Sequence, residues 1–201
     1  MAEFSRYREA ARVIKAGGVI AFRTDTFYGL GADPLNATAV RRIWELKGRE
    51  AGKPILLLIS DREQVSRFVS APSSKFYQLA TSFWPGPLTL VGAAHSNLPE
   101  ELTAGTGTIG LRLPDDDRAR SLLNACGGAL TATSANPSSQ APARNASDVQ
   151  TYFGDQIDLI LDDGETESNA PSTVVDATGS EARVVREGLI TRSELAKWLA
   201  K

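Results

Sequence analysis

The chain has 201 residues, of which 42% are hydrophobic and 23% are charged, a balance that is typical of a globular protein and excludes collagen-like, fibrous and largely disordered chains. Its formal net charge of -2 and its pI near 5.5 argue against a protein that holds nucleic acid over a broad basic surface. The start of the sequence lacks the apolar core of a secretory signal, and no run of about 18 uncharged apolar residues is present, so we expect one cytoplasmic domain with no membrane contact.

Cysteine and histidine are nearly absent, which limits the chemistry that the chain can perform. Cys126 is the only cysteine and His95 the only histidine. A disulfide framework, a histidine-dependent triad and most kinds of zinc site are therefore excluded. We expect Cys126 to act as a small buried hydrophobe, and His95, which lies in a polar stretch, to be a solvated loop residue and not a catalytic base.

Apolar periodicity alternates between helix-like and strand-like segments along the chain. Helices are predicted over residues 5–16, from the N-cap Asn36 to Lys47, up to Phe68 behind a Ser60–Glu63 capping box, over 73–83 and 116–126, and from Thr191 with Glu194 as a second capping box. Strands are predicted over residues 19–23, 55–59, 88–93, 108–113, 129–132, 157–161, 173–175 and 183–185. This order predicts one α/β domain with a mixed sheet, because crossover helices favour parallel neighbours and the strand-rich tail favours antiparallel ones.

A glycine motif in the middle of the chain has two readings. Residues 105–110, GTGTIG, fit the dinucleotide-binding pattern GxGxxG. That pattern binds pyrophosphate only where it joins a strand to the N-terminus of a helix, whereas here it precedes a strand. Glycines that form a turn at the strand entry are the favoured explanation, and the chain contains no P-loop.

Three polar clusters follow predicted elements at positions where ligands often bind. Residues 23–31, RTDTFYGLG, combine hydroxyls, a carboxylate and glycines, although Thr24 and Asp25 could equally make local turn hydrogen bonds. Residues 47–54 place three cations around two glycines, which suits phosphate oxygens or else completes a helix C-terminus. Residues 131–137, TATSANP, could bind a base, ribose or phosphate, or could form Asx and Ser turns.

Two arginines stand in otherwise apolar strand segments. Arg112 lies in GTIGLRLP and Arg186 in VVREG. Each is either a surface strand residue or a cleft residue that holds a carboxylate or a phosphate.

In this order the motifs RTDTFYGLG, KGREAGKP, FWPGPLT, GTIGLRLP, TSANPS and PSTVVD make the chain similar to the YrdC/Sua5 family of threonylcarbamoyl-AMP synthases. The similarity extends from about Val19 to Gly188. It implies the short form of the family, with a single domain over residues 1–201, a motif-bearing core over about 7–190 and a C-terminal helix over about 192–200. It also implies a twisted mixed sheet with flanking helices around a positively charged cavity.

The resemblance further implies which residues form the site. The family's KxR and SxN residues, expected to be catalytic, fall on Lys47, Arg49, Ser134 and Asn136. Its ATP contacts fall on these four together with Lys53, Arg144 and Arg186. Its threonine contacts fall on Thr26, Thr108, Arg112 and Ser172. No protein metal site is implied, so Mg²⁺ is expected to arrive with ATP, and no tightly bound organic cofactor is expected.

The implied reaction converts ATP, L-threonine and bicarbonate into threonylcarbamoyl-adenylate and pyrophosphate. The implied partners are a downstream threonylcarbamoyl transferase and, through a weak contact, tRNA. Two alternatives stay open: a non-catalytic module that binds double-stranded RNA, and a carbamoyl transferase. Three positions depart from the family pattern, where Arg23 and Glu50 replace prolines and Leu58 stands in the place of a histidine.

Overall fold

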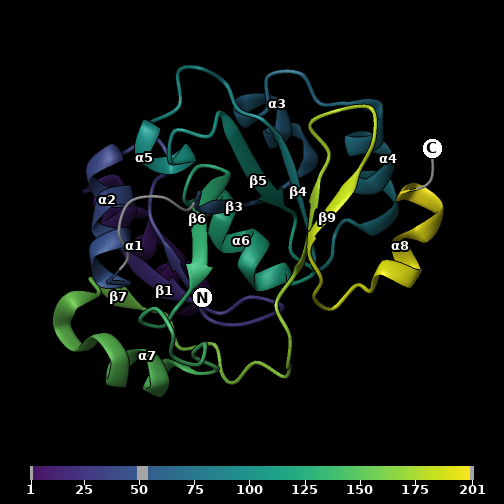
Figure 1. The fold of residues 1–201 in the computed structure, drawn as a ribbon. Coiled ribbons are helices and arrows are strands. Elements are labelled where there is room, and N and C mark those ends of the chain that lie inside the picture. Colours follow the sequence, from purple (N-terminus) through teal and green to yellow (C-terminus); the bar gives the residue numbers. More distant parts are fainter. Residues whose placement is uncertain (1, 49–53, 200–201) are drawn as a thin grey trace.

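A nine-stranded mixed sheet runs through the computed structural model, which describes residues 2–48 and 54–199 (Figure 1). Its strands are β1 (Ile20–Phe22), β2 (Gly29–Gly31), β3 (Leu56–Ile59), β4 (Leu88–Ala93), β5 (Thr108–Arg112), β6 (Ala129–Ser134), β7 (Leu159–Ile160), β8 (Thr173–Asp176) and β9 (Arg183–Arg186). They lie in the order β7-β1-β2-β6-β3-β5-β4-β8-β9.

The pairing confirms the mixed sheet predicted from the sequence. Strand β1 is parallel to β7, β3 to β5, and β4 to β8, and helices lie in the connections of these pairs. The other neighbours are antiparallel, including the β8–β9 hairpin of the strand-rich tail.

Helices lie around the sheet and begin largely where the capping residues predict. They are α1 (Ala2–Lys15), α2 (Ala37–Leu46), α3 (Val65–Phe68), α4 (Ser74–Phe83), α5 (Glu100–Thr103), α6 (Asp117–Ala125), α7 (Ala146–Phe153) and α8 (Arg192–Leu199), with 3-10 turns at Arg62–Gln64 and Gly154–Gln156. In residues 2–48 and 54–199, none of them is long and apolar enough to cross a membrane.

The buried hydrophobic side chains form two clusters, and successive residues of a strand alternate between them. In β1, Ala21 belongs to the larger cluster, whereas Ile20 and Phe22 belong to the smaller cluster. In β3, Leu57 likewise belongs to the larger cluster and Leu58 to the smaller one. Successive side chains of a strand point to opposite faces, so the two clusters lie on the two faces of the sheet. Helices α1 and α6, which contact each other, cover the face of the smaller cluster.

Most of the predicted caps are confirmed by side-chain hydrogen bonds. The Asn36 side chain accepts from the Ala39 N–H at 3.1 Å, and α2 is followed by Gly48 at a φ of +59°. The Thr191 hydroxyl and the Glu194 carboxylate each accept from the other's backbone N–H, which is the reciprocal capping box.

The Ser60 cap was wrong, because the neighbouring Asp61 takes that position. The Asp61 carboxylate accepts from the Gln64 N–H at 3.3 Å, and the Ser60 hydroxyl donates to this same carboxylate. Together these bonds hold the Asp61 pKa below its ordinary value against the opposing effect of burial.

Several elements lie outside the predictions. Strand β2 falls in the segment interpreted as a loop, and its three residues, two of them glycines, carry no periodic signal. It is a strand because β1 and β6 supply hydrogen bonds on both of its sides. Helix α5 and helix α7 were not predicted either, and β6 continues past Ala132 to Ser134.

Candidate active site

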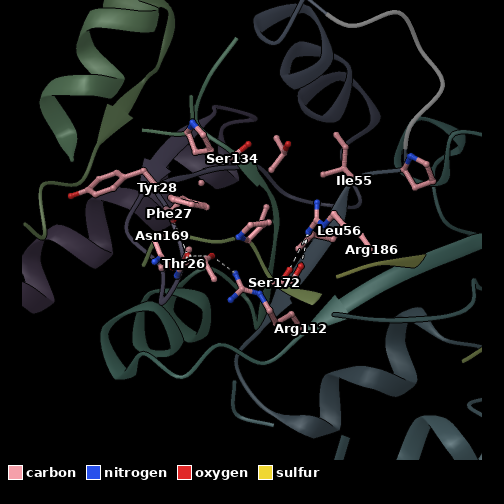
Figure 2. Close-up of a pocket in the computed structure, with 17 residues that line it drawn as sticks. Thr26, Phe27, Tyr28, Ile55, Leu56, Arg112, Ser134, Asn169, Ser172 and Arg186 are labelled. Carbon is pink, nitrogen blue, oxygen red and sulfur yellow. Dashed lines mark hydrogen bonds between the residues drawn. The ribbon is translucent and has the colours of Figure 1, made fainter. Parts of the chain in front are cut away.

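A cavity of about 480 Å³ brings the polar clusters of the sequence together (Figure 2). It is lined by residues 24 and 26–28 of the β1–β2 loop, Gly29 of β2, residues 54 and 55 before β3, Leu56 of β3, Arg112 at the end of β5, 132–134 of β6, Pro142, the end of the β7–β8 connection at 169 and 171–172, and Arg186 of β9. This volume lies in the range of small-molecule sites.

Strand register explains why distant segments meet at this place. Gly29 pairs with Ser134, and Leu56 pairs with Ala132. Leu58, two residues after Leu56, lies beside Arg112 in the parallel β3–β5 pair. Ala132 and Leu56 pack in the smaller cluster, so the cavity opens on the face of the sheet that α1 and α6 cover in part.

Arg112 lies on the wall of the cavity and is almost completely buried, with 4% of its surface exposed. Its Nη1 forms an ion pair with the Asp25 carboxylate, and its Nη2 donates to the Thr26 hydroxyl at 3.2 Å (Figure 2). Its Nε is buried without a partner. The cleft position is therefore confirmed for Arg112, but both terminal nitrogens already have a protein partner.

Arg186 and Ser172 form the part of the wall beside Arg112 (Figure 2). The guanidinium of Arg186 donates to the Ser172 carbonyl at 2.9 Å and lies 3.4 Å from the Ser172 hydroxyl, which itself lies 3.0 Å from the Thr89 hydroxyl. Burial, and after it the charge of Arg112, lower the Arg186 pKa. Because arginine stays charged in proteins, an anion bound near both guanidiniums would relieve this unfavourable electrostatics.

Lys47 lies behind the cavity wall and is only 1% exposed. Its Nζ donates to the backbone carbonyls of Ser134 at 2.6 Å and Asn136 at 2.8 Å, and lies 3.4 Å from the Asn136 side-chain oxygen. The Asn136 amide in turn donates to the carbonyls of Pro137 and Gln140. Ser134, at the end of β6, lines the cavity, whereas Lys47 and Asn136 hold the backbone of residues 134–136 in place.

The other expected site residues lie apart or outside the described residues. Arg144 donates to the Thr166 carbonyl at 2.9 Å and lies near Glu165. Thr108 stands at the start of β5, with its hydroxyl 2.9 Å from that of Thr106. Neither is among the described residues that line the cavity. Arg49 and Lys53 lie outside the described residues, as does Glu50.

The sequence did not single out every residue of the wall. Phe27 and Tyr28 were visible only as members of their loop, and Asn169 lies in the β7–β8 connection, which has no periodicity. The Tyr28 hydroxyl donates to the Gly164 carbonyl at 2.8 Å and accepts from the Asp163 N–H at 3.1 Å, so it ties this connection to the β1–β2 loop. Burial raises the Tyr28 pKa, so the hydroxyl stays protonated.

His95 and Cys126 are not among the described residues that line the cavity. The His95 ring contacts the Ser66 carbonyl at 3.1 Å. Cys126 was expected to be a buried hydrophobe but is only half-buried. It packs against the smaller cluster, and burial raises the pKa of its thiol to about 12. Gly105 and Gly107 both have a positive φ in the turn before β5, which fits turn glycines.

Two of the departures from the family pattern have structural explanations. Arg23 forms an ion pair at 3.2 Å with Asp116, the N-cap of α6. Leu58 is completely buried in the smaller cluster, where an apolar side chain is suited.

The charge of the cavity follows from few residues. The charged side chains among the described lining residues are Arg112 and Arg186, and Asp25 partly neutralises Arg112 from outside the lining. A positive potential of the whole cavity stays a prediction, since Arg49 and Lys53 lie outside the described residues.

Comparison with known proteins shows the relationship of the whole chain. Residues 12–188 match the Sua5/YciO/YrdC family, described as "telomere recombination". A threonylcarbamoyl-AMP synthase of Halorhodospira halophila is 38% identical over 78% of this chain and 82% of the relative, and one of Thiobacillus denitrificans is 40% identical over 85% and 90%.

A solved structure of Pyrococcus abyssi Sua5 in complex with L-threonine superposes with a TM-score of 0.93 at 36% identity. That alignment covers 98% of this chain and 58% of the Pyrococcus chain, so this chain spans little more than half of that longer protein. The chain belongs to the Sua5/YciO/YrdC family.

Proposed function

We propose that this chain is an L-threonylcarbamoyladenylate synthase, which converts L-threonine, bicarbonate and ATP into threonylcarbamoyl-adenylate and pyrophosphate. The observation that carries this proposal is the cavity in which Arg112, Arg186, Thr26, Ser134 and Ser172 meet. It occurs in a chain whose relatives are named threonylcarbamoyl-AMP synthase, and one related structure contains L-threonine.

The chemistry needs little from side chains beyond positioning and charge. The neutral amine of threonine attacks the carbon of bicarbonate and water leaves, which gives a carbamate. A carbamate oxygen then attacks the α-phosphorus of ATP, and the bond to the leaving pyrophosphate breaks. Holding these groups in line and neutralising phosphate charge accounts for most of the acceleration in such transfers, and a cavity without histidine or cysteine in its described lining is compatible with that.

We assign the two substrates to neighbouring parts of the cavity. Arg112, Thr26 and Ser172 lie together and bind threonine in this proposal, whereas Thr108 lies apart from the cavity lining. Ser134, at the end of β6, faces the nucleotide, and Lys47 and Asn136 hold the backbone around it in place. Arg49, Lys53, Arg144 and Arg186 supply further charge for the phosphates, and magnesium enters as part of the MgATP substrate.

The product has an expected use. A mixed anhydride with AMP is an activated acyl donor, so a downstream transferase must move the threonylcarbamoyl group to its acceptor, adenosine in tRNA. Since ATP and tRNA are both present in the cytoplasm, we place the reaction there. Weak contact of this chain with tRNA belongs to the same proposal.

Pyrophosphate release tests the proposal. With MgATP, L-threonine and bicarbonate together the protein should release pyrophosphate, and omission of any one should abolish the release. Release that continues without threonine and bicarbonate would contradict the assignment. If the chain instead uses carbamoyl phosphate, or binds double-stranded RNA without any turnover, one of the two alternative functions applies.

A further inference from the structure

Asp25 lies directly behind the arginine to which we assign the threonine carboxylate. One of its carboxylate oxygens pairs with Arg112 Nη1, and the other accepts from the Asp115 N–H at 3.3 Å. The side chains of Asp25 and Arg112 are 10% and 5% exposed. Asp25 does not line the cavity itself, so it reaches a ligand only through Arg112.

A chain of hydroxyls holds the other side of the same guanidinium, and its hydrogen-bond direction can be assigned. Thr24 donates its proton to the Phe27 carbonyl at 2.8 Å. The Thr24 hydroxyl oxygen therefore accepts in its 3.0 Å contact with Thr26, and Thr26 is the donor. Thr26 is then left with oxygen lone pairs, one of which accepts from Arg112 Nη2 at 3.2 Å.

The guanidinium is thus fixed from two sides by groups of the protein itself. Each terminal nitrogen carries two N–H groups, and one of each is used by Asp25 or by Thr26. Arg112 lines the cavity, so in the proposal below its remaining N–H groups donate to a carboxylate bound there. A planar guanidinium favours such a two-point contact only when its plane is held in the matching orientation.

We propose that Asp25 is a positioning residue, which orients Arg112 to receive the carboxylate of L-threonine; this rests on the proposed function. Two effects of removing its charge oppose each other. Loss of the negative charge leaves the cavity more positive, which strengthens the attraction of any anion, whereas loss of orientation weakens only the ligand that Arg112 holds. Orientation dominates in this proposal, because removing one partner of a buried ion pair leaves the other charge uncompensated, and Arg112 then loses the group that holds its plane.

The test is a double-mutant cycle on the full chain with Asp25→Asn, Arg112→Lys and both together, measured by calorimetric titration with L-threonine and, separately, with MgATP. Asp25→Asn should weaken threonine binding by about tenfold or more, with little change for MgATP. The double variant should bind threonine with about the same affinity as whichever single variant binds it less tightly, because both changes disable the same contact.

Asp116→Asn is the matched control. Asp116 is a carboxylate of the neighbouring loop, pairs with Arg23 and caps α6, and asparagine caps helices equally well. It should leave threonine affinity unchanged. Asp25→Ser, which also removes the charge, provides the measurement if Asp25→Asn does not stay folded, and it should weaken threonine binding in the same selective way.

Unchanged or stronger threonine binding in the Asp25 variants, equal losses for both ligands, or additive losses in the cycle would each overturn the proposal. A wild-type protein that binds MgATP but no threonine would overturn the proposed function itself, and this inference with it.

Discussion

Replacing Lys47 by methionine removes a buried ammonium from a fully bonded position. The Nζ donates to two backbone carbonyls within 2.8 Å, and the side chain is 1% exposed. A hydrogen bond from a charged donor contributes about 1.5–3 kcal/mol, while methionine avoids the desolvation of an ammonium and fills most of the space. We therefore expect Lys47→Met to lower the free energy of unfolding by about 3 kcal/mol.

For a chain of this size, each kcal/mol changes the melting temperature by about 2–4 °C. Thermal unfolding followed by circular dichroism should thus show a decrease of about 6–12 °C. Lys15→Met, at an exposed position in the last turn of α1, is the control and should change stability by no more than about 0.5 kcal/mol. A Lys47 variant with an unchanged melting temperature but a strong loss of ATP binding would refute the reasoning, because Lys47 would then serve the phosphates and not the loop.

Four further outcomes are expected. Arg112→Lys should weaken threonine binding by about tenfold or more in a calorimetric titration, since lysine keeps the charge but loses the fork; equal affinities would assign Arg112 to the fold. Arg49→Ala should slow turnover on the order of 100-fold with nearly unchanged melting temperature, by analogy with other transition-state donors; normal turnover would place the phosphate site elsewhere. The raised pKa of the Cys126 thiol keeps it protonated. In the folded protein it should therefore react with a thiol reagent on the order of 1,000-fold more slowly at pH 8 than in the unfolded chain, and the rate in the folded protein should rise tenfold per pH unit. Equal rates would show an accessible thiolate. Gly188→Ala would place a Cβ 2.2 Å from the Pro171 carbonyl oxygen, so it should destabilise the chain by about 1–3 kcal/mol in denaturant unfolding and weaken threonine binding; wild-type stability would contradict this packing.

The fold was predictable wherever local chemistry determined an element. The Asn36 cap and the Thr191–Glu194 capping box lie within single turns, and both are confirmed. The mixed sheet followed from the alternation of elements. Strand β2 could not be predicted, because its neighbours β1 and β6, which are distant in sequence, supply the hydrogen bonds that make it a strand.

The site was predictable as a set of residues but not as a set of contacts. The sequence left Arg112 either on the strand surface or in a cleft, and the structure shows the cleft position. It could not show that Asp25 already occupies one terminal nitrogen, since that ion pair joins residues from two separate strand ends. The burial of the Lys47 ammonium against the carbonyls of Ser134 and Asn136 is likewise a tertiary property. From the charge of its sequence segment alone, Lys47 would be expected to face solvent.

The most direct measurement of the central claim uses bicarbonate labelled with ¹³C. The protein is mixed with MgATP, L-threonine and the labelled bicarbonate, and the products are separated at once and analysed by mass spectrometry. The account predicts an adenylate whose mass is that of threonylcarbamoyl-AMP increased by the single heavy carbon, with the label in the carbamoyl group and pyrophosphate formed in equal amount. An adenylate of threonine alone without the label, or no adenylate while pyrophosphate accumulates, would contradict it.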